Sequence, residues 1–284
     1  MNRYMLLALA FSLATPTLTQ GRTWKIEVDG LGGAPTIQAG IDSAAVGDTV
    51  LVGPGTYFEN ISFKGKDLSL IGERGPHFTI IDGSEGDDTV VFFPGGETRD
   101  CLLHGFTITG GRGARDPGSA RGGGIYCPTG SPVIRGNLIV GNTADRDGTG
   151  TGGGMTVGRG TLAKEIPAPL IENNTFENNV AVGTGGALTL QHTRAIVRLN
   201  KFYKNRILVG DGGAIFQQQI RPSEVVLEDN EFWENRANDH GGAIHVDHIG
   251  PGAGPTTITG NLLVRNIGEG LDLGDTGSGG GIYV

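Results

Sequence analysis

Short apolar runs alternate with polar, glycine-rich turns along most of the chain and return about every 30 residues. The spacings between successive copies are 30, 33, 27, 29 and 38 residues. The runs are short and β-branched, without the spacing of an amphipathic helix, so each repeat is expected to be one coil of short strands. The motif that marks the repeat is Gly-Gly-small-apolar, whose apolar residue is Ile125, Met155, Leu188, Ile215, Ile244 or Ile282.

A second motif, Asn-x-apolar-x-x-Asn, occurs five times and fixes the register of the coils. Parallel strands lie ~4.8 Å apart, so equivalent residues of successive coils should lie directly over one another. The amides would then form a ladder at a bend where Asn tolerates left-handed backbone, each link contributing about 1 kcal/mol. The first Asn of each copy is Asn137, Asn174, Asn200, Asn230 or Asn261, and the apolar residue, expected inside, is Ile139, Phe176, Phe202, Phe232 or Leu263.

The outward position two residues before each ladder Asn tests this register independently. Its residues are Arg135, Glu172, Arg198, Glu228 and Thr259, so opposite charges meet from coil to coil. Exposed cross-strand pairs contribute only about 0.2 to 1 kcal/mol each, which makes them evidence for register rather than a source of stability. The sequence therefore predicts an all-β, single-stranded right-handed parallel β-helix of about seven coils.

The segment before the repeats fits the same architecture. Residues 34–46 are predicted to form an N-terminal cap, with a short amphipathic helix from Thr36 to Val46 that covers the first strand edge. Its apolar face would consist of Ile37, Ile41, Ala44 and Ala45. Residues 47–111 would form the first two coils and residues 112–284 the remaining repeats. The sequence stops inside a strand, so either it is a fragment or its open last coil makes an end-to-end contact.

The first 20 residues read as a secretory signal, because one early cation precedes an apolar run too short to span a bilayer. The mature chain, residues 21–284, is therefore expected to be secreted, periplasmic or on the cell surface, without a transmembrane segment. In an oxidising compartment Cys101 and Cys127 could pair, or they could be two small buried hydrophobic residues. The formal charge of -8 argues against a nucleic-acid partner, which normally requires a basic surface.

The best concentration of titratable groups is His245, Asp247 and His248, predicted as the catalytic set. A histidine beside a carboxylate could act as a general base or bind a metal, whereas the alternative is a group of solvated residues on an outer face. Aspartates also gather in the turns before Gly-Gly, and Asp211 and Asp239 are the predicted ligands of a calcium edge. The other members are Asp145, Asp147, Asp272 and Asp275. All of them could equally be ordinary turn residues.

Three further residues are predicted to bind substrate. Tyr203 and Trp233 occupy the same outward position on adjacent coils and could stack against sugar rings, or pack beneath a loop. His192 shares a column with His248, about 10 Å away on the ladder spacing.

Two family resemblances cover roughly residues 34–284. The segment GDTVLVGPGTYFENISFKGKDLSLIG, residues 47–72, resembles the first coil of the pectate-lyase-like β-helix fold. The repeats that pair GGAI or GGAL with FENN, FYKN and FWEN resemble those of polymorphic outer membrane proteins, which are bacterial surface adhesins. The resemblances imply an exported protein that binds and could cleave a polysaccharide, with calcium as the implied cofactor. The alternative is a non-catalytic adhesion or structural module, which could be a fragment of a larger protein.

Overall fold

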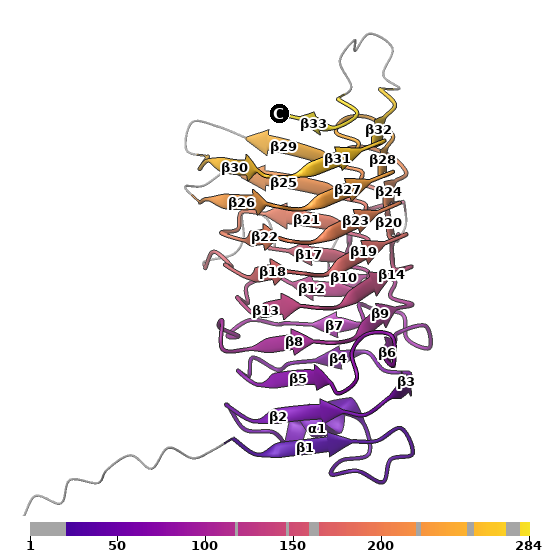
Figure 1. The fold of residues 1–284 in the computed structure, drawn as a ribbon, viewed down its shortest axis with the longest axis vertical. Coiled ribbons are helices and arrows are strands. Elements are labelled where there is room, and N and C mark those ends of the chain that lie inside the picture. Colours follow the sequence, from indigo (N-terminus) through magenta and orange to yellow (C-terminus); the bar gives the residue numbers. More distant parts are fainter. Residues whose placement is uncertain are drawn as a thin grey trace, which may run out of the picture.

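The chain forms a parallel β-solenoid of about eight turns, one more than the sequence indicates, with the coils stacked along the long axis (Figure 1). The computed structural model describes residues 21–116, 119–145, 148–158, 165–219, 223–248, 253–270 and 279–284. The predicted signal segment, residues 1–20, lies outside these ranges. The predicted all-β parallel helix is confirmed.

Three long parallel sheets, which we call A, B and C, are joined from β15 onward by a fourth, sheet E, and a complete coil contributes strands to them in the order C, A, B, E. Sheet A contains β1 (Thr23–Ile26), β2 (Thr49–Val52), β5 (Ser69–Gly72), β8 (Leu102–His104), β13 (Val133–Arg135), β18 (Leu170–Glu172), β22 (Ile196–Arg198), β26 (Val225–Glu228) and β30 (Thr256–Thr259). Sheet B contains β3 (Gly55–Tyr57), β6 (Thr79–Asp82), β9 (Thr107–Thr109), β14 (Leu138–Val140), β19 (Thr175–Glu177), β23 (Lys201–Tyr203), β27 (Glu231–Trp233) and β31 (Leu262–Val264).

The other sheets carry the features discussed below. Sheet C contains β4 (Ile61–Ser62), β7 (Val91–Phe92), β12 (Ile125–Cys127), β17 (Met155–Val157), β21 (Leu188–Gln191), β25 (Ile215–Gln219), β29 (Ile244–His248) and β33 (Ile282–Tyr283). Sheet E contains β15 (Thr143–Ala144), β20 (Val180–Ala181), β24 (Arg206–Ile207), β28 (Arg236–Ala237) and β32 (Ile267–Gly268). A small sheet D joins the antiparallel hairpin β10 (Ala114–Asp116) and β11 (Ser119–Arg121) to β16 (Gly150–Thr151).

The interior holds one continuous apolar core built from columns of equivalent residues. The predicted column is confirmed, since Ile139, Phe176, Phe202, Phe232 and Leu263 pair in register from β14 to β31. The ring of Phe202 stacks on Phe176 at 4.9 Å and on Phe232 at 4.8 Å, nearly parallel in both cases. Stacked rings at the strand spacing fill the interior without gaps and hold neighbouring coils in register.

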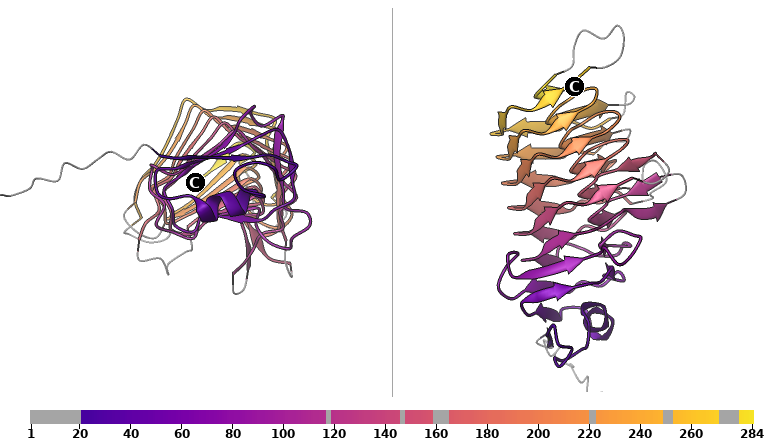
Figure 2. Two further views of the ribbon diagram at one scale, coloured as in Figure 1. Left: turned by 90° about the horizontal axis from the view of Figure 1, so that it is seen from below. Right: turned by 90° about the vertical axis from the view of Figure 1, so that its right-hand side faces the viewer.

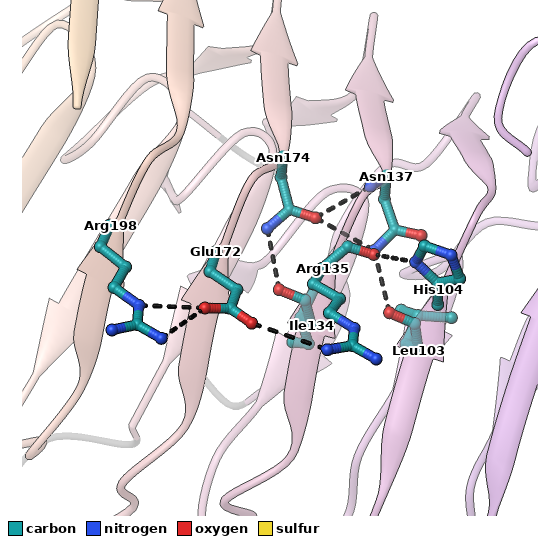
Figure 3. A network of polar contacts seen from close by, with 8 residues as sticks. All are labelled: Leu103, His104, Ile134, Arg135, Asn137, Glu172, Asn174 and Arg198. Carbon is teal, nitrogen blue, oxygen red and sulfur yellow. Dashed lines mark hydrogen bonds and ion pairs between the residues drawn. The ribbon is translucent and has the colours of Figure 1, made fainter. Parts of the chain in front are cut away.

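The predicted asparagine ladder is present, and it is buried except at Asn261, which is partly exposed (Figure 3). The Nδ2 of Asn137 donates to Oδ1 of Asn174 at 3.1 Å, and the backbone N–H of Asn137 donates to the same oxygen at 3.0 Å. The same pair of bonds recurs at each step up to Asn261. A second, parallel ladder runs through Asn142, Asn179, Asn205, Asn235 and Asn266.

The ladder residues themselves do not take up the left-handed backbone expected of them. The residue immediately before each first-ladder Asn does so instead, with φ between 52° and 66°: Gly136, Asn173, Leu199, Asp229 and Gly260. The amide can then point inward, because the bend is made one position earlier.

The alternating charges lie in register on the outer face of sheet A (Figure 3). Arg198 donates through Nε and a terminal nitrogen to one carboxylate oxygen of Glu172, at 3.0 and 2.8 Å. Arg135 lies 3.9 Å from the other oxygen of Glu172.

The helix α1 (Ile37–Ser43) packs against β1, β2 and β4 at the end of the stack where β1 lies (Figure 2). Ile37 and Ile41 join the core, whereas Ala45 lies beyond the helix and is exposed, which corrects the longer predicted helix. The Glu59 carboxylate accepts from the backbone N–H groups of Ile37 and Gln38, at 2.8 and 2.9 Å, so the next coil caps the helix. Within the described ranges, no helix has the length and apolar character needed to cross a lipid bilayer.

Cys101 and Cys127 are free thiols, both fully buried. Burial raises the pKa of each thiol well above its ordinary value, and Cys127 Sγ donates to the carbonyl of Gly130 at 3.3 Å. The two cysteines are therefore small buried hydrophobic residues in this structure and do not form a disulfide.

Candidate functional site on the outer face of sheet C

One outward-facing column runs along the whole of sheet C, from β4 to β33. Strand register places its residues directly over one another: Ser62, Phe92, Tyr126, Thr156, Thr189, Phe216, His245 and Tyr283. Successive members lie one strand spacing apart, ~4.8 Å. The column carries a cleft at its Phe92 end and a histidine cluster at its His245 end.

The middle of this column is covered by the turns that precede Gly-Gly, although it faces away from the core. Thr156 and Thr189 are fully buried, and each hydroxyl donates to the carbonyl of the residue five positions earlier, Thr151 or Thr184, at 2.7 and 2.8 Å. The turn folds back over its own strand because left-handed glycines, Gly152 in the first case, reverse the chain. Positions i and i+5 therefore meet in these two coils.

A cleft of about 410 Å³ opens over β4, β7 and β12. Its floor is an aromatic pair, in which the rings of Phe92 and Tyr126 stack with centroids 5.7 Å apart at 24°. Phe92 is partly exposed in the cleft, whereas Tyr126 is only 5% exposed. The cleft thus offers a partly exposed aromatic ring that stacks on a second, buried ring.

Polar groups line the rim of this cleft: Asn60, Asp88, Thr89 and Arg115. Arg115 comes from β10 of the hairpin and pairs with Asp87 at 2.6 Å, with both side chains exposed. Asn60 Nδ2 donates to the carbonyl of Thr89 at 2.7 Å, which fixes the direction of the amide and leaves its oxygen facing Gly86. An aromatic floor with an amide, a carboxylate and a guanidinium around it is typical of a binding pocket.

The histidine cluster lies at the other end of the column. His240 Nδ1 lies 3.0 Å from Asp211 Oδ1 and 3.2 Å from Asp239 Oδ1, and its backbone N–H donates to Asp211 Oδ1 at 3.0 Å. His245 Nδ1 lies 3.6 Å from the same Asp211 oxygen. The donor atoms of Asp211, His240 and His245 all lie within 4.8 Å of one another.

His245 is buried, which excludes the alternative of a solvated outer residue. It is 8% exposed, and its ring is sandwiched between Phe216 and Tyr283 with centroids 5.2 and 5.1 Å away. Burial lowers the pKa of His245 below its ordinary value of 6.5, although the nearby carboxylates, Asp211 first, oppose this effect. Burial thus favours the neutral imidazole, the form that acts as a base or a metal ligand.

The predicted catalytic residues do not converge. Asp247 shares the outer face with His245, but one of its oxygens accepts from Gln218 Nε2 at 3.1 Å. His248 lies on the opposite face by strand alternation, is exposed, and contacts Thr256 Oγ1 through Nε2 at 3.2 Å. His245 instead meets residues of the preceding turns.

The predicted substrate-binding residues lie elsewhere. His192 is 4% exposed at the end of β21, in left-handed backbone. Tyr203 and Trp233 pair in register on the outer face of sheet B and are half-buried. Lys204 Nζ lies 4.7 Å from the Tyr203 ring, and Trp233 Nε1 donates to Glu231 at 3.3 Å. These three residues belong to neither the cleft nor the cluster.

The predicted metal pair, Asp211 and Asp239, does come together, on either side of His240. Asp145 is exposed in another coil, and Asp147, Asp272 and Asp275 lie outside the described residues. His240 was not predicted, although a signal existed: it precedes Gly241-Gly242 as Asp211 precedes Gly212-Gly213. The sequence analysis also missed the cleft residues. Arg115 comes from an insertion, Phe92 from the short strand β7, and Asn60 and Asp88 from turns that do not repeat.

Comparison with known families gave one finding: the model described as "Right handed beta helix region" matches residues 91–284. None of the curated proteins matches the chain. The match covers more than half of the sequence and includes both β12 of the cleft and the whole histidine cluster.

Proposed function

Since the chain belongs to the right-handed β-helix family, we propose that it is an exported protein that binds a polysaccharide at the cleft over β4, β7 and β12. The observation that carries the proposal is the stacked pair of Phe92 and Tyr126 inside a polar rim. Sugar rings present apolar C–H faces and a belt of hydroxyls, so they need both an aromatic surface and hydrogen-bonding groups.

The rim supplies groups of both kinds. Arg115 can only donate hydrogen bonds and ionised Asp88 can only accept them, so the rim offers both kinds of partner. The formal charge of -8 favours a neutral or weakly charged glycan, since a polyanion would be repelled over most of the surface. The predicted signal segment at residues 1–20 supports export and hence an extracellular glycan.

Binding without cleavage is the form of the proposal that the site geometry favours. His245, Asp247 and His248 each contact a different partner, so they do not form a joint acid and base. Within the described part of the cleft, Asp88 is the carboxylate on the rim, whereas glycoside hydrolysis ordinarily uses a pair. The function is therefore recognition of a glycan, as in an adhesion module.

The test is a panel of neutral and uronate oligosaccharides, with affinity measured by calorimetry for the mature protein. Phe92→Ala should weaken binding of the best ligand about tenfold or more, equal to about 1.4 kcal/mol, since the partly exposed ring is lost. Phe78→Ala is the matched control, because Phe78 is 54% exposed but does not line the cleft.

Trp233→Ala separates this cleft from the outer face of sheet B. Unchanged affinity supports the cleft, whereas a loss confined to Trp233→Ala would assign recognition to sheet B. The same mixtures are assayed for reducing ends and unsaturated products, with and without calcium. Product formation, or a panel with no binder at all, would overturn the proposal.

A further inference from the structure

We propose that Asp211, His240 and His245 form a binding site for a zinc-like divalent cation that joins two consecutive coils. The site lies four strand spacings from Tyr126, about 19 Å along sheet C, so it is independent of the cleft. The proposal rests on the arrangement of donor atoms and on one buried nitrogen.

The fold brings His240 and His245 together as it does the threonine pairs of two other coils. In the middle of the stack, positions i and i+5 are both threonine, and their hydroxyl oxygens lie 3.2 Å apart for Thr151 and Thr156 and 3.4 Å apart for Thr184 and Thr189. Two coils later the same positions are His240 and His245. Two threonine hydroxyls that are close enough to hydrogen-bond to each other are thus replaced by two imidazoles that lie near the carboxylate of Asp211.

The donor separations fit a shared ion. Asp211 Oδ1 lies 3.0 Å from His240 Nδ1 and 3.6 Å from His245 Nδ1. Two ligands that each lie about 2.1 Å from a tetrahedral ion are roughly 3.4 Å apart. Small side-chain adjustments would therefore bring the three atoms to coordination distance.

His245 provides a second, independent observation. Its side chain is nine-tenths buried, and its Nδ1 has no hydrogen-bond partner within the described ranges. Phe216 and Tyr283 hold the ring on both faces, so the nitrogen cannot turn towards solvent. A buried nitrogen fixed towards a carboxylate lacks only a group that accepts its lone pair.

The ligand chemistry selects the class of cation. Two imidazole nitrogens and one carboxylate oxygen suit zinc and similar transition metals, whereas calcium takes six to eight oxygen ligands. The predicted calcium edge at Asp211 and Asp239 is therefore revised. Asp211 precedes β25 whereas His240 and His245 come with β29, so the ion would link successive coils as a staple.

The test uses the tag-free mature protein, treated with EDTA and dialysed. Zinc titration by calorimetry should give one site per chain, zinc should raise the melting temperature, and cobalt should give the visible absorption of a nitrogen- and oxygen-ligated site. Calcium at the same concentration should leave the melting temperature unchanged. Absence of one-to-one zinc binding would overturn the proposal.

Variants locate the site. His245→Phe keeps an aromatic ring next to Phe216, so the fold should survive. Its zinc affinity should fall by at least about 100-fold. Loss of a residue that only supports a metal ligand would lower the affinity by about 10- to 100-fold. Asp211→Asn should weaken zinc binding in the same direction. His248→Ala is the matched control and should bind zinc as the unaltered protein does. Zinc binding that survives both His245→Phe and Asp211→Asn, with circular dichroism confirming the fold, would refute the site.

Discussion

At the scale of single residues, the buried amides of the two ladders hold the coils together. Asn200 illustrates their part: its Nδ2 donates to Asn230 Oδ1 and to the carbonyls of Ile171 and Arg198. Its own Oδ1 accepts from both the backbone and the side chain of Asn174. One side chain thus satisfies polar groups on three successive coils, where no water is available to replace it.

Asn200→Ala should lower the free energy of unfolding by about 2 to 4 kcal/mol, because it leaves buried donors and acceptors without partners. Urea-induced unfolding followed by circular dichroism measures the loss. Thr175→Ala, an outward change on β19, is the control and should cost less than about 0.5 kcal/mol. Equal losses for the two variants would contradict the ladder's energetic role.

Many of the contacts between single residues could be predicted from the sequence. A fixed spacing of Asn, apolar residue and Asn specifies which residues stack, and the ladders and the Phe202 column follow from the strand spacing alone. His240 escaped prediction because its partner His245 is five residues away, a separation that neither a strand nor a helix brings into contact. The meeting depends on how the Gly-Gly turn folds back.

At the scale of elements, the bends between sheets A and B impose left-handed backbone on one residue per coil. Leu199 occupies this position with φ 56° and is 54% exposed. An L-residue with a Cβ pays roughly 1 to 2 kcal/mol there, less for Asn, whose short polar side chain bonds locally. Asn173 fills the equivalent place in the preceding coil.

Leu199→Asn should therefore stabilise the protein by about 0.5 to 1 kcal/mol, and thermal unfolding measures the gain. Leu208→Asn provides a matched control, since Leu208 is also exposed, at 39%, but is absent from the left-handed positions. It should give no increase in melting temperature. A gain in both variants would mean that removal of surface apolar area, rather than backbone strain, is responsible.

The elements themselves show where sequence reasoning succeeds and fails. The strand β2 (Thr49–Val52) follows the alternation of its side chains between the core and the outer face, which a local pattern can show. The helix was predicted too long, since Ala44 and Ala45 continue the helical spacing while Asp48 caps the chain after it, accepting from Ala45 N–H at 2.9 Å. Side-chain caps from residues further along the chain, such as Glu59, are not visible in a local pattern.

At the scale of the whole molecule, the strand pairing joins neighbouring coils, so stability is close to a sum of nearest-neighbour terms. Two arginines reach one coil further: Arg99 donates to the carbonyl of Ala168 at 3.1 Å, and Arg121 donates to Gln191 at 2.8 Å. The cleft belongs to this scale as well. The cleft forms where the hairpin β10–β11 lies beside the aromatic pair of β7 and β12. The repeat pattern does not predict where such an inserted hairpin packs. The sequence therefore predicts the stack and its columns but not the hollow beside them.

Asn261→Ala tests the nearest-neighbour character of the stack. Loss of amide hydrogen-exchange protection should be confined to β26, β27, β30 and β31, which flank the bends that Asn261 joins through Asn230 and the carbonyls of Leu227 and Thr259. The strands β5, β8 and β13 should keep their exchange rates and serve as the internal control. A uniform loss over all strands would show instead that the stack unfolds as one cooperative unit.

The alternating charges on sheet A also bear on how such a protein can lengthen or shorten. Deleting residues 136–172 would set Arg135 against Arg198, a like-charged pair, whereas deleting residues 136–198 would set Arg135 against Glu228. Like charges directly opposite one another are unfavourable. Gain or loss of repeats in this part of the chain is therefore favoured in even numbers, so the column imposes a parity on the evolution and the engineering of its length.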